Sequence, residues 1–224
     1  MKRLFCILLL LFPLFTNAQA VRKKNVLIDL GGGLGVYHAY DNLWGQLSTK
    51  KANAGAYLLH AGISYAIIDQ FTMGAELQVQ SFLTESGDTT RIAEAGNGGS
   101  WLIRSDYYFL KKEKFTWFAG LGIGGAGLNY ERSEIDTLGN ITTGKVYGEG
   151  PRITPRMGIK LFFGKKRYFG FFLDYGFNAY VYNIKMFTIN DVEQDRMSYR
   201  PTEEVILNAR GHEIRFGLSL RFGK

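Results

Sequence analysis

Residues 26–35 read VLIDLGGGLG, and the spacing within this stretch decides the fold class. The glycines fit the turn of a nucleotide-binding enzyme, but such a turn must open a helix, with apolar residues then recurring every three or four positions. Here Val26, Ile28 and Leu30 alternate with Asp29 and the glycines that follow. A period of two predicts a β-strand, so the stretch is not a cofactor-binding loop.

The same alternation recurs along the whole chain. The GLGIGG run at residues 120–125 fits a dinucleotide pattern but also alternates. The predicted strands cover residues 25–38, 55–67, 71–83, 100–110, 115–130, 152–163, 168–182 and 212–222. Segments of about ten residues or more can cross a membrane as tilted strands. No apolar run after Phe15 is long enough to predict a membrane-spanning helix.

The predicted connections alternate in length. Short turns fall at Ile68–Gln70, Lys111–Lys114 and Gly164–Arg167, and long loops fall at residues 39–54, 84–99, 131–151 and 183–211. Short periplasmic turns and long external loops are typical of outer-membrane barrels. The sequence therefore predicts an all-β fold, an eight-stranded antiparallel transmembrane up-and-down β-barrel. A soluble sandwich would alternate too, but would not explain strand length, loop asymmetry and interior charge together.

The first residues, MKRLFCILLLLFPLFTNAQA, have the layout of a secretory signal peptide. A positive start precedes the apolar stretch Leu4–Phe15, and small residues follow it. We predict a cleavable signal at residues 1–20 and a single barrel domain at residues 21–224, with cleavage after either Ala18 or Ala20. The mature chain would then lack cysteine, because Cys6 lies within the signal.

Charge is confined to one face of the predicted strands. The outward face of all eight carries no Lys, Arg, Asp or Glu, although 21% of the chain is charged. A Lys or Arg facing the middle of the bilayer costs about 2–4 kcal/mol, which explains the absence. The inward face predicts a structural network of charges that fill the lumen. Its predicted members are Asp29, Glu76, Asp106, Asp174 and Glu213 with Arg104, Arg156, Lys160, Arg215 and Arg221.

Glycines and aromatic residues fit the same architecture. The inward glycines are expected to make room for long side chains from the opposite wall, because an eight-stranded lumen is just wide enough to be filled. Aromatic residues at the strand ends predict interface girdles. They are Tyr65, Phe71, Phe109, Phe115, Trp117, Phe163, Phe169 and Phe222 beside the turns, and Tyr57, Trp101 and Tyr130 toward the loops. Pro155, on the lipid face, predicts a β-bulge.

The chain resembles the small outer-membrane barrels of the OmpA and OmpX type and the outer-membrane β-barrel domain group that includes PorT-like proteins. The closing strand HEIRFGLSLRF carries the resemblance, with Ile214, Phe216, Leu218, Leu220 and Phe222 toward lipid. The resemblance implies that the barrel-insertion machinery recognises this strand. Gly223 and Lys224 after the last aromatic residue depart from the family pattern.

Catalytic, cofactor and metal sites are not predicted. A lipid A-modifying barrel enzyme would need His, Ser and a carboxylate together at the level of the outer leaflet. His38, His60 and His212 are scattered, and local spacing places no serine beside any of them. His60 is expected to be a satisfied polar residue of the lumen. Three scattered histidines offer no zinc-ligand pattern.

The predicted function is that of an integral outer-membrane barrel of a Gram-negative cell, with a structural or surface-interaction role. Its expected partners are outer-membrane lipids, the insertion machinery and a protein or ligand at the long loops. The net charge of +7 does not indicate nucleic acid, which an exported chain seldom meets. A small channel for ions or solutes, or a lipid A-modifying enzyme, remains the alternative.

Overall fold

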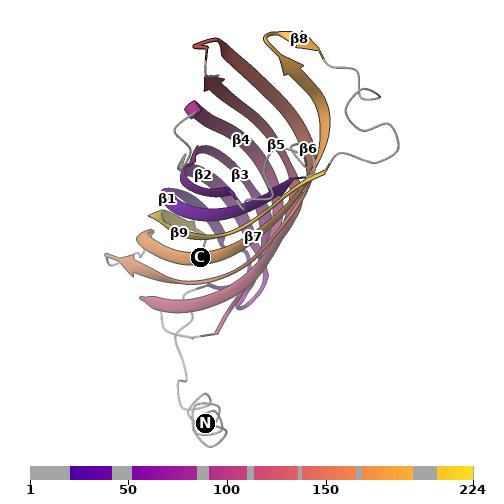
Figure 1. Cartoon of the computed structure of the whole chain (residues 1–224). Helices are drawn as coiled ribbons and strands as arrows, with labels where there is room; N and C mark the ends of the chain where they lie inside the picture. Colours follow the sequence, from indigo (N-terminus) through magenta and orange to yellow (C-terminus); the bar gives the residue numbers. More distant parts are fainter. Residues whose placement is uncertain are drawn as a thin grey trace, which may run out of the picture.

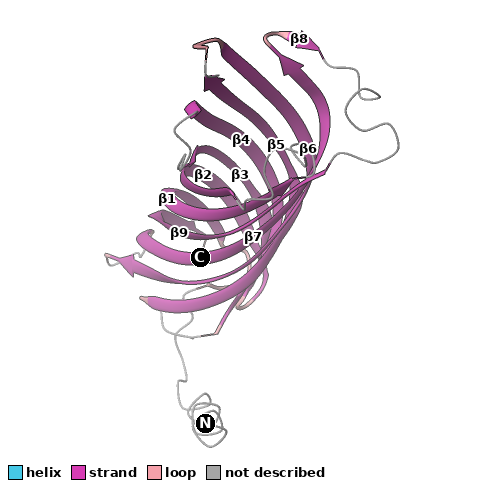
Figure 2. Cartoon of the chain, viewed as in Figure 1, coloured by secondary structure: helices cyan, strands magenta, loops and turns pink. Residues whose placement is uncertain are grey.

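The computed structural model describes residues 21–41, 52–84, 91–109, 114–135, 138–164, 168–193 and 206–223. The predicted signal peptide at residues 1–20 lies outside these ranges and stays a prediction. Within them, almost every residue is in a β-strand, as Figure 2 shows. No helix in the described ranges is long and apolar enough to cross a membrane.

Eight long antiparallel strands form a closed ring (Figure 1). The strands are β1 (Val26–Asp41), β2 (Ala52–Ile68), β3 (Phe71–Thr84), β4 (Arg91–Tyr108), β5 (Phe115–Ile135), β6 (Ile141–Phe163), β7 (Phe169–Ile189) and β9 (Ile206–Phe222). Each strand pairs with its neighbours in the chain, and β1 pairs with β9 to close the ring. The two-residue strand β8 (Val192–Glu193) pairs only with β7. The predicted up-and-down barrel is confirmed.

The predicted alternation sets which side chains face the lumen. In β7, exposed Phe171, Leu173 and Tyr175 alternate with buried Phe172 and Asp174. The other strands alternate in the same way, so every second residue points into the lumen and the rest point outward. The outward face predicted from the sequence is therefore the outward face of the barrel.

The ring has two unlike ends. At the turn end, short connections join β2 to β3, β4 to β5 and β6 to β7, as predicted. At the loop end, several strands run farther than predicted: β4 begins at Arg91, β6 at Ile141 and β9 at Ile206. Much of the predicted loops at 84–99, 131–151 and 183–211 is therefore strand. The sequence pattern did not predict these extensions because they lack an apolar outward face. Hydrogen bonds between neighbouring strands form without such a face.

The predicted bulge at Pro155 is wrong. Pro155 lies opposite Leu121 of β5 with no change of register. Toward β7 the ladder omits this position, yet the register on either side of it is the same. Proline removes a ladder hydrogen bond without adding a residue to the strand. The register shift between β6 and β7 instead lies between Tyr147 and Gly148, in the loop-end extension.

Candidate functional site in the barrel lumen

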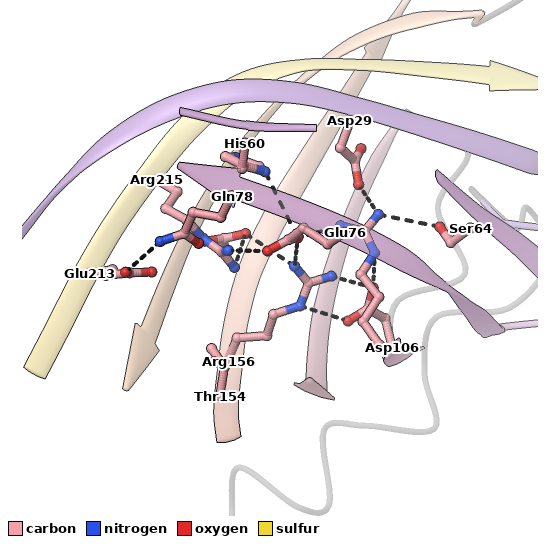
Figure 3. A network of polar contacts seen from close by, with 12 residues as sticks. Asp29, His60, Ser64, Glu76, Gln78, Asp106, Thr154, Arg156, Glu213 and Arg215 are labelled. Atoms are coloured by element: carbon pink, nitrogen blue, oxygen red, sulfur yellow. Dashed lines mark hydrogen bonds and ion pairs between the residues drawn. The ribbon is translucent and has the colours of Figure 1, made fainter. Parts of the chain in front are cut away.

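Glu76 of β3 is the centre of the lumen's polar network (Figure 3). Its Oε2 accepts hydrogen bonds from Nη1 of Arg104 at 2.8 Å and from Nη1 of Arg156 at 3.2 Å. Its Oε1 accepts one from Nη1 of Arg215 at 2.7 Å. The three arginines come from β4, β6 and β9, so one carboxylate joins four walls of the barrel.

Two of these arginines also bind a carboxylate of their own through both arms of the guanidinium. Arg156 donates from Nε and Nη2 to Asp106 at 2.9 and 2.5 Å. Arg215 donates from Nε and Nη2 to Asp174 at 2.7 and 3.2 Å. Bidentate pairs of this kind fix geometry as well as charge. Each pair joins strands that are neighbours or next-but-one in the ring.

Asp29 of β1 completes the lower part of the network. It accepts hydrogen bonds from Arg104, from Nζ of Lys160 at 2.7 and 2.8 Å, and from the Ser219 hydroxyl at 2.7 Å. Gly62 leaves the space that Arg104 needs, because a Cβ there would lie 2.8 Å from the arginine Nη1. The expected role of the inward glycines holds at this position.

Arg152 organises a second layer nearer the loop end. The residue is 1% exposed, and its Nη2 lies 3.4 Å from Oε2 of Glu213. Its other hydrogen-bond acceptors are Ser100 at 2.5 Å, Asn178 at 2.6 Å, Gln78 at 3.0 Å and Thr154 at 3.0 Å. Tyr37 and Gln78 also donate to Glu213. The sequence interpretation missed Arg152, although the alternation that places Arg156 in the lumen also places Arg152 there.

Buried charge of the two signs balances within the described residues. The buried acids are Asp29, Glu76, Asp106, Asp174 and Glu213, and the buried bases are Arg104, Arg152, Arg156, Lys160 and Arg215. Nine of these residues were in the predicted set. The tenth predicted member, Arg221, lies half-buried at the turn end, with its guanidinium 4.6 Å from the centre of the Phe162 ring. Arg152, which was not in the predicted set, is the fifth buried base.

An apolar cluster covers the network at each end. The turn-end cluster consists of Val21, Leu27, Ala66, Tyr108, Phe118 and Phe162. The loop-end cluster consists of Tyr37, Ala54, Ala56, Phe82, Ala126, Leu128, Tyr180, Tyr182 and Ala209. Tyr130 packs against the loop-end cluster, so it is not part of an outward girdle. The lumen is thus layered, with paired charges between two apolar plugs.

The three histidines do not all lie together: one is in the lumen and two are on the outer wall. His60 is buried beside Phe172, and its Nδ1 lies 3.8 Å from Oε2 of Glu76. The hydrogen bonds expected of His60 are not found among the described protein groups. His38 and His212 are exposed on the outer wall. His212 stacks on Tyr175, whose hydroxyl bonds to its Nδ1. No cluster of three or more His, Cys, Asp or Glu suited to a metal occurs among the described residues.

The outer wall is an apolar belt. Leu59, Leu77 and Phe216, for example, are 66%, 65% and 59% exposed, far more than a soluble core permits. Aromatic residues ring the turn end, where Phe169 packs on Phe171 and Tyr168 on Phe222. Where side chains are described, exposed charges on the strands occur only in the loop-end extensions and in β8: Glu131, Lys145, Glu149, Lys185, Glu193 and Arg210. A continuous apolar wall of this size on a closed ring belongs in lipid.

Comparison with known proteins identifies the fold. No family model and no characterised relative matches the sequence. The structure is similar to the outer membrane protein OprG from Pseudomonas aeruginosa, with a TM-score of 0.53 and 10% identity over 93% of this chain and 100% of that one. It is also similar to the outer membrane protein AlkL in lipid bilayers, with a TM-score of 0.52 and 11% identity over 93% of this chain and 95% of that one. The chain therefore has the fold of the small outer-membrane β-barrels, with eight strands in its ring and a lipid-facing outer wall.

Proposed function

We propose that this protein is a sealed barrel of the outer membrane, with a structural or surface-interaction role and no transport pathway through its lumen. The observation that carries the proposal is the layered lumen, in which five acids and five bases pair between two apolar clusters. Eight strands enclose a space that side chains can fill, whereas barrels with aqueous channels have about 16 or more strands. The paired charged side chains fill the lumen and link strands on different sides of the barrel.

The pairing itself favours a closed lumen. Moving a charge out of water is costly, and mutual attraction offsets this cost only when the pair has good geometry and further hydrogen bonds. Arg156 and Arg215 meet both conditions through their bidentate bonds to Asp106 and Asp174. Opening a pore here would separate these pairs. An ion could pass through the lumen only if several of these short hydrogen bonds broke at the same time.

Conductance in planar bilayers tests the sealed lumen. We expect the purified wild-type monomer to show no steady conductance at any voltage that the bilayer tolerates. A double variant, Arg152→Ala with Phe82→Ala, opens the loop-end layers and serves as the matched control, in which brief leaks should appear. Stable, ion-selective steps from the wild-type protein would overturn the proposal and favour a small channel.

The loop-end extensions are the proposed contact surface. β5 and β6 stay paired as far as Ile135 and Ile141, well beyond the apolar belt. Leu138 in the connection between them is 85% exposed, and Val192 of β8 is 63% exposed. Apolar side chains and strand edges on an exposed surface can bind a partner by adding a strand or by apolar contact.

Site-specific photo-crosslinking in intact cells tests this surface. A photoreactive residue at Leu138 should give a discrete adduct, whereas the same residue at exposed Lys23 of the turn end should not give that adduct. Equal labelling from both positions, or none from Leu138 and Val192, would contradict a surface-interaction role. The alternative of a lipid A-modifying enzyme would require a histidine beside a serine and a carboxylate. The described ring contacts of His212 are with Tyr175 and Phe177, so they do not favour this alternative.

A further inference from the structure

The outer wall carries an open groove of about 810 Å³, separate from the filled lumen. Several of its lining side chains are strongly exposed: Leu34, Tyr57, Leu59, Val79 and Phe216 are between 57% and 66% accessible. The groove therefore lies on the lipid-facing surface. Its volume falls within the range of about 300–1,000 Å³ that is typical of small-ligand sites.

Two adjacent rows of residues, running across the strands, shape the groove. The strand register aligns Gly32, Leu59, Val79, Gly99 and Gly127 in one row. The next row toward the loop end aligns Leu34, Tyr57, Ser81, Asn97, Asn129 and Tyr147. The first row lacks side chains at three positions, so it forms a floor, and the second row forms a rim.

Among the described residues, no atom requires Gly99 or Gly127 to be glycine. A Cβ added at Gly99 would meet no atom within 4 Å, and one at Gly127 would meet only the Gly148 carbonyl oxygen at 4.0 Å. At Gly124, by contrast, a Cβ would collide with the backbone of Trp101. Glycine inside a strand weakens the strand and often marks a place where a ligand approaches the backbone. The space over Gly99 and Gly127 faces outward, and no described residue fills it.

The polarity of the lining changes along the groove. At the β1 end it is apolar, with Leu34, Leu59 and Phe216. At the β4–β6 end it has the amides of Asn97 and Asn129 and the hydroxyl of Tyr147. The Tyr147 hydroxyl donates to the Glu149 carboxylate, and Ser81 donates to the amide oxygen of Asn97. None of the lining residues carries a charge, but the exposed carboxylate of Glu149 lies next to Gly127 in the continuation of the first row.

The groove also rises toward the loop end. Gly32 is six residues from Val26 at the turn end of β1, whereas Gly127 is 12 residues from Phe115 at the turn end of β5. At about 3.3 Å per residue, six more residues place Gly127 about 20 Å farther along its strand. The apolar end thus lies deep in the belt, and the polar end lies at its loop-end edge.

We propose that this groove binds one glycolipid of the outer leaflet. An acyl chain lies along the floor formed by Gly32, Gly99 and Gly127, and sugar hydroxyls bond to Asn97, Asn129 and Tyr147. An amide-rich rim with the Glu149 carboxylate beside it suits uncharged hydroxyl groups, which can donate to amide and carboxylate oxygens, better than an anionic phosphate. The change from apolar to polar lining along the groove matches a single amphiphilic molecule. The apolar belt of a second barrel would instead present apolar side chains at both ends of the groove.

Native mass spectrometry of the mature protein, released from detergent, tests the site. The probe is a synthetic diglucosyl diacylglycerol, compared with phosphatidylglycerol and phosphatidylethanolamine that carry the same acyl chains. Gly99→Leu fills the floor without a clash inside the chain. Gly55→Leu is the matched control, because Gly55 also faces outward and its Cβ would meet only the Leu83 oxygen at 3.8 Å, yet it lies outside the groove. Asn129→Leu removes a polar group from the rim without touching the floor.

The wild-type protein should retain one glucosyl lipid in preference to either phospholipid. Gly99→Leu and Asn129→Leu should each lower that retention about tenfold, a change of about 1.4 kcal/mol, and Gly55→Leu should not. Equal retention of all three lipids, or unchanged retention in both groove variants, would contradict the proposal. A wild-type dimer that Gly99→Leu abolishes would show a protein interface instead. Each variant is first checked for the gel shift of a folded barrel, so loss of the fold is distinguished from loss of the site.

Discussion

The two faces of each strand in this barrel reverse the arrangement of a soluble protein. The inward face buries ten charged residues in five acid and five base positions, while the outward face exposes leucines and phenylalanines. A soluble protein would place its charges in water and its apolar residues in the core. Here the inner charges have fixed partners and the outer apolar residues have lipid. The contribution of the inner face to stability therefore depends on the pairing of its acids with its bases. The contribution of the outer face depends on the absence of charged side chains.

The largest expected effect comes from the centre of the inner network. Glu76→Gln removes the one carboxylate that three arginines share, and it leaves buried positive charge without compensation. Removing one partner of a buried pair typically costs 3–5 kcal/mol, so we expect a loss of about that size. Urea unfolding in lipid vesicles, followed by gel mobility, measures it. Glu131→Gln, on the exposed extension, is the matched control and should leave the midpoint unchanged.

The outer face responds to the opposite change. Leu121→Arg places a charge on the lipid-facing wall, in the turn-end half of β5 that carries the apolar belt, and should cost about 2–4 kcal/mol. Leu138→Arg introduces the same side chain beyond the belt and should be tolerated. The same unfolding measurement compares the two. Equal stability of both variants would mean that Leu121 does not face lipid.

Backbone packing separates two neighbouring inward glycines. In Gly124→Ala the new methyl group would strike the Trp101 carbonyl, whereas in Gly122→Ala it would meet only the movable Leu102 side chain at 3.1 Å. Overpacking costs about 1–3 kcal/mol, so Gly124→Ala should be clearly destabilised and Gly122→Ala less so. Thermal unfolding of both variants in one detergent measures the difference. The reverse order would show that strand spacing relaxes at position 124.

Much of this architecture could be predicted because a period of two fixes the face of every residue once a strand is located. That rule placed Glu76, Arg104 and Arg156 in the lumen before their partners were known. It could not say which charges meet, because pairing depends on strand stagger around the ring. Arg221 illustrates this: it has inward parity, but it lies half-buried at the turn end, where its guanidinium is over the Phe162 ring.

The strand ends were harder to predict for a different reason. Apolar alternation marks only the part of a strand that lies in lipid, so it stopped at residue 152 in β6, although the ladder continues to Ile141. Beyond the belt, hydrogen bonds to β5 and β7 hold the strand, and they leave no apolar pattern. The outer groove could not be predicted from the sequence either, because Gly99 and Gly127 become neighbours only through the pairing register of β4 and β5.

The smallest effect is expected where a charge pair lies in water. Nζ of Lys145 is 2.6 Å from Asp191 in the loop-end extension, and this hydrogen bond raises the pKa of Lys145. Exposed pairs contribute little and are screened by salt. Lys145→Gln should therefore leave the unfolding midpoint unchanged within error. A loss comparable to that of Glu76→Gln would remove the contrast between buried and exposed charge.

The central claim, that buried pairs hold the walls of the lumen together, is tested most directly by a double-mutant cycle on Arg156 and Asp106. The cycle compares Arg156→Gln, Asp106→Asn and the double variant by their free energies of unfolding in vesicles. Residues in direct contact show coupling of about 0.5–3 kcal/mol, and the two short bonds of this pair place the expected value at the upper end. Each single variant should be strongly destabilised, and the double variant should lose much less than the sum of the two. Losses that simply add would contradict the account, because the two charges would then contribute nothing through each other.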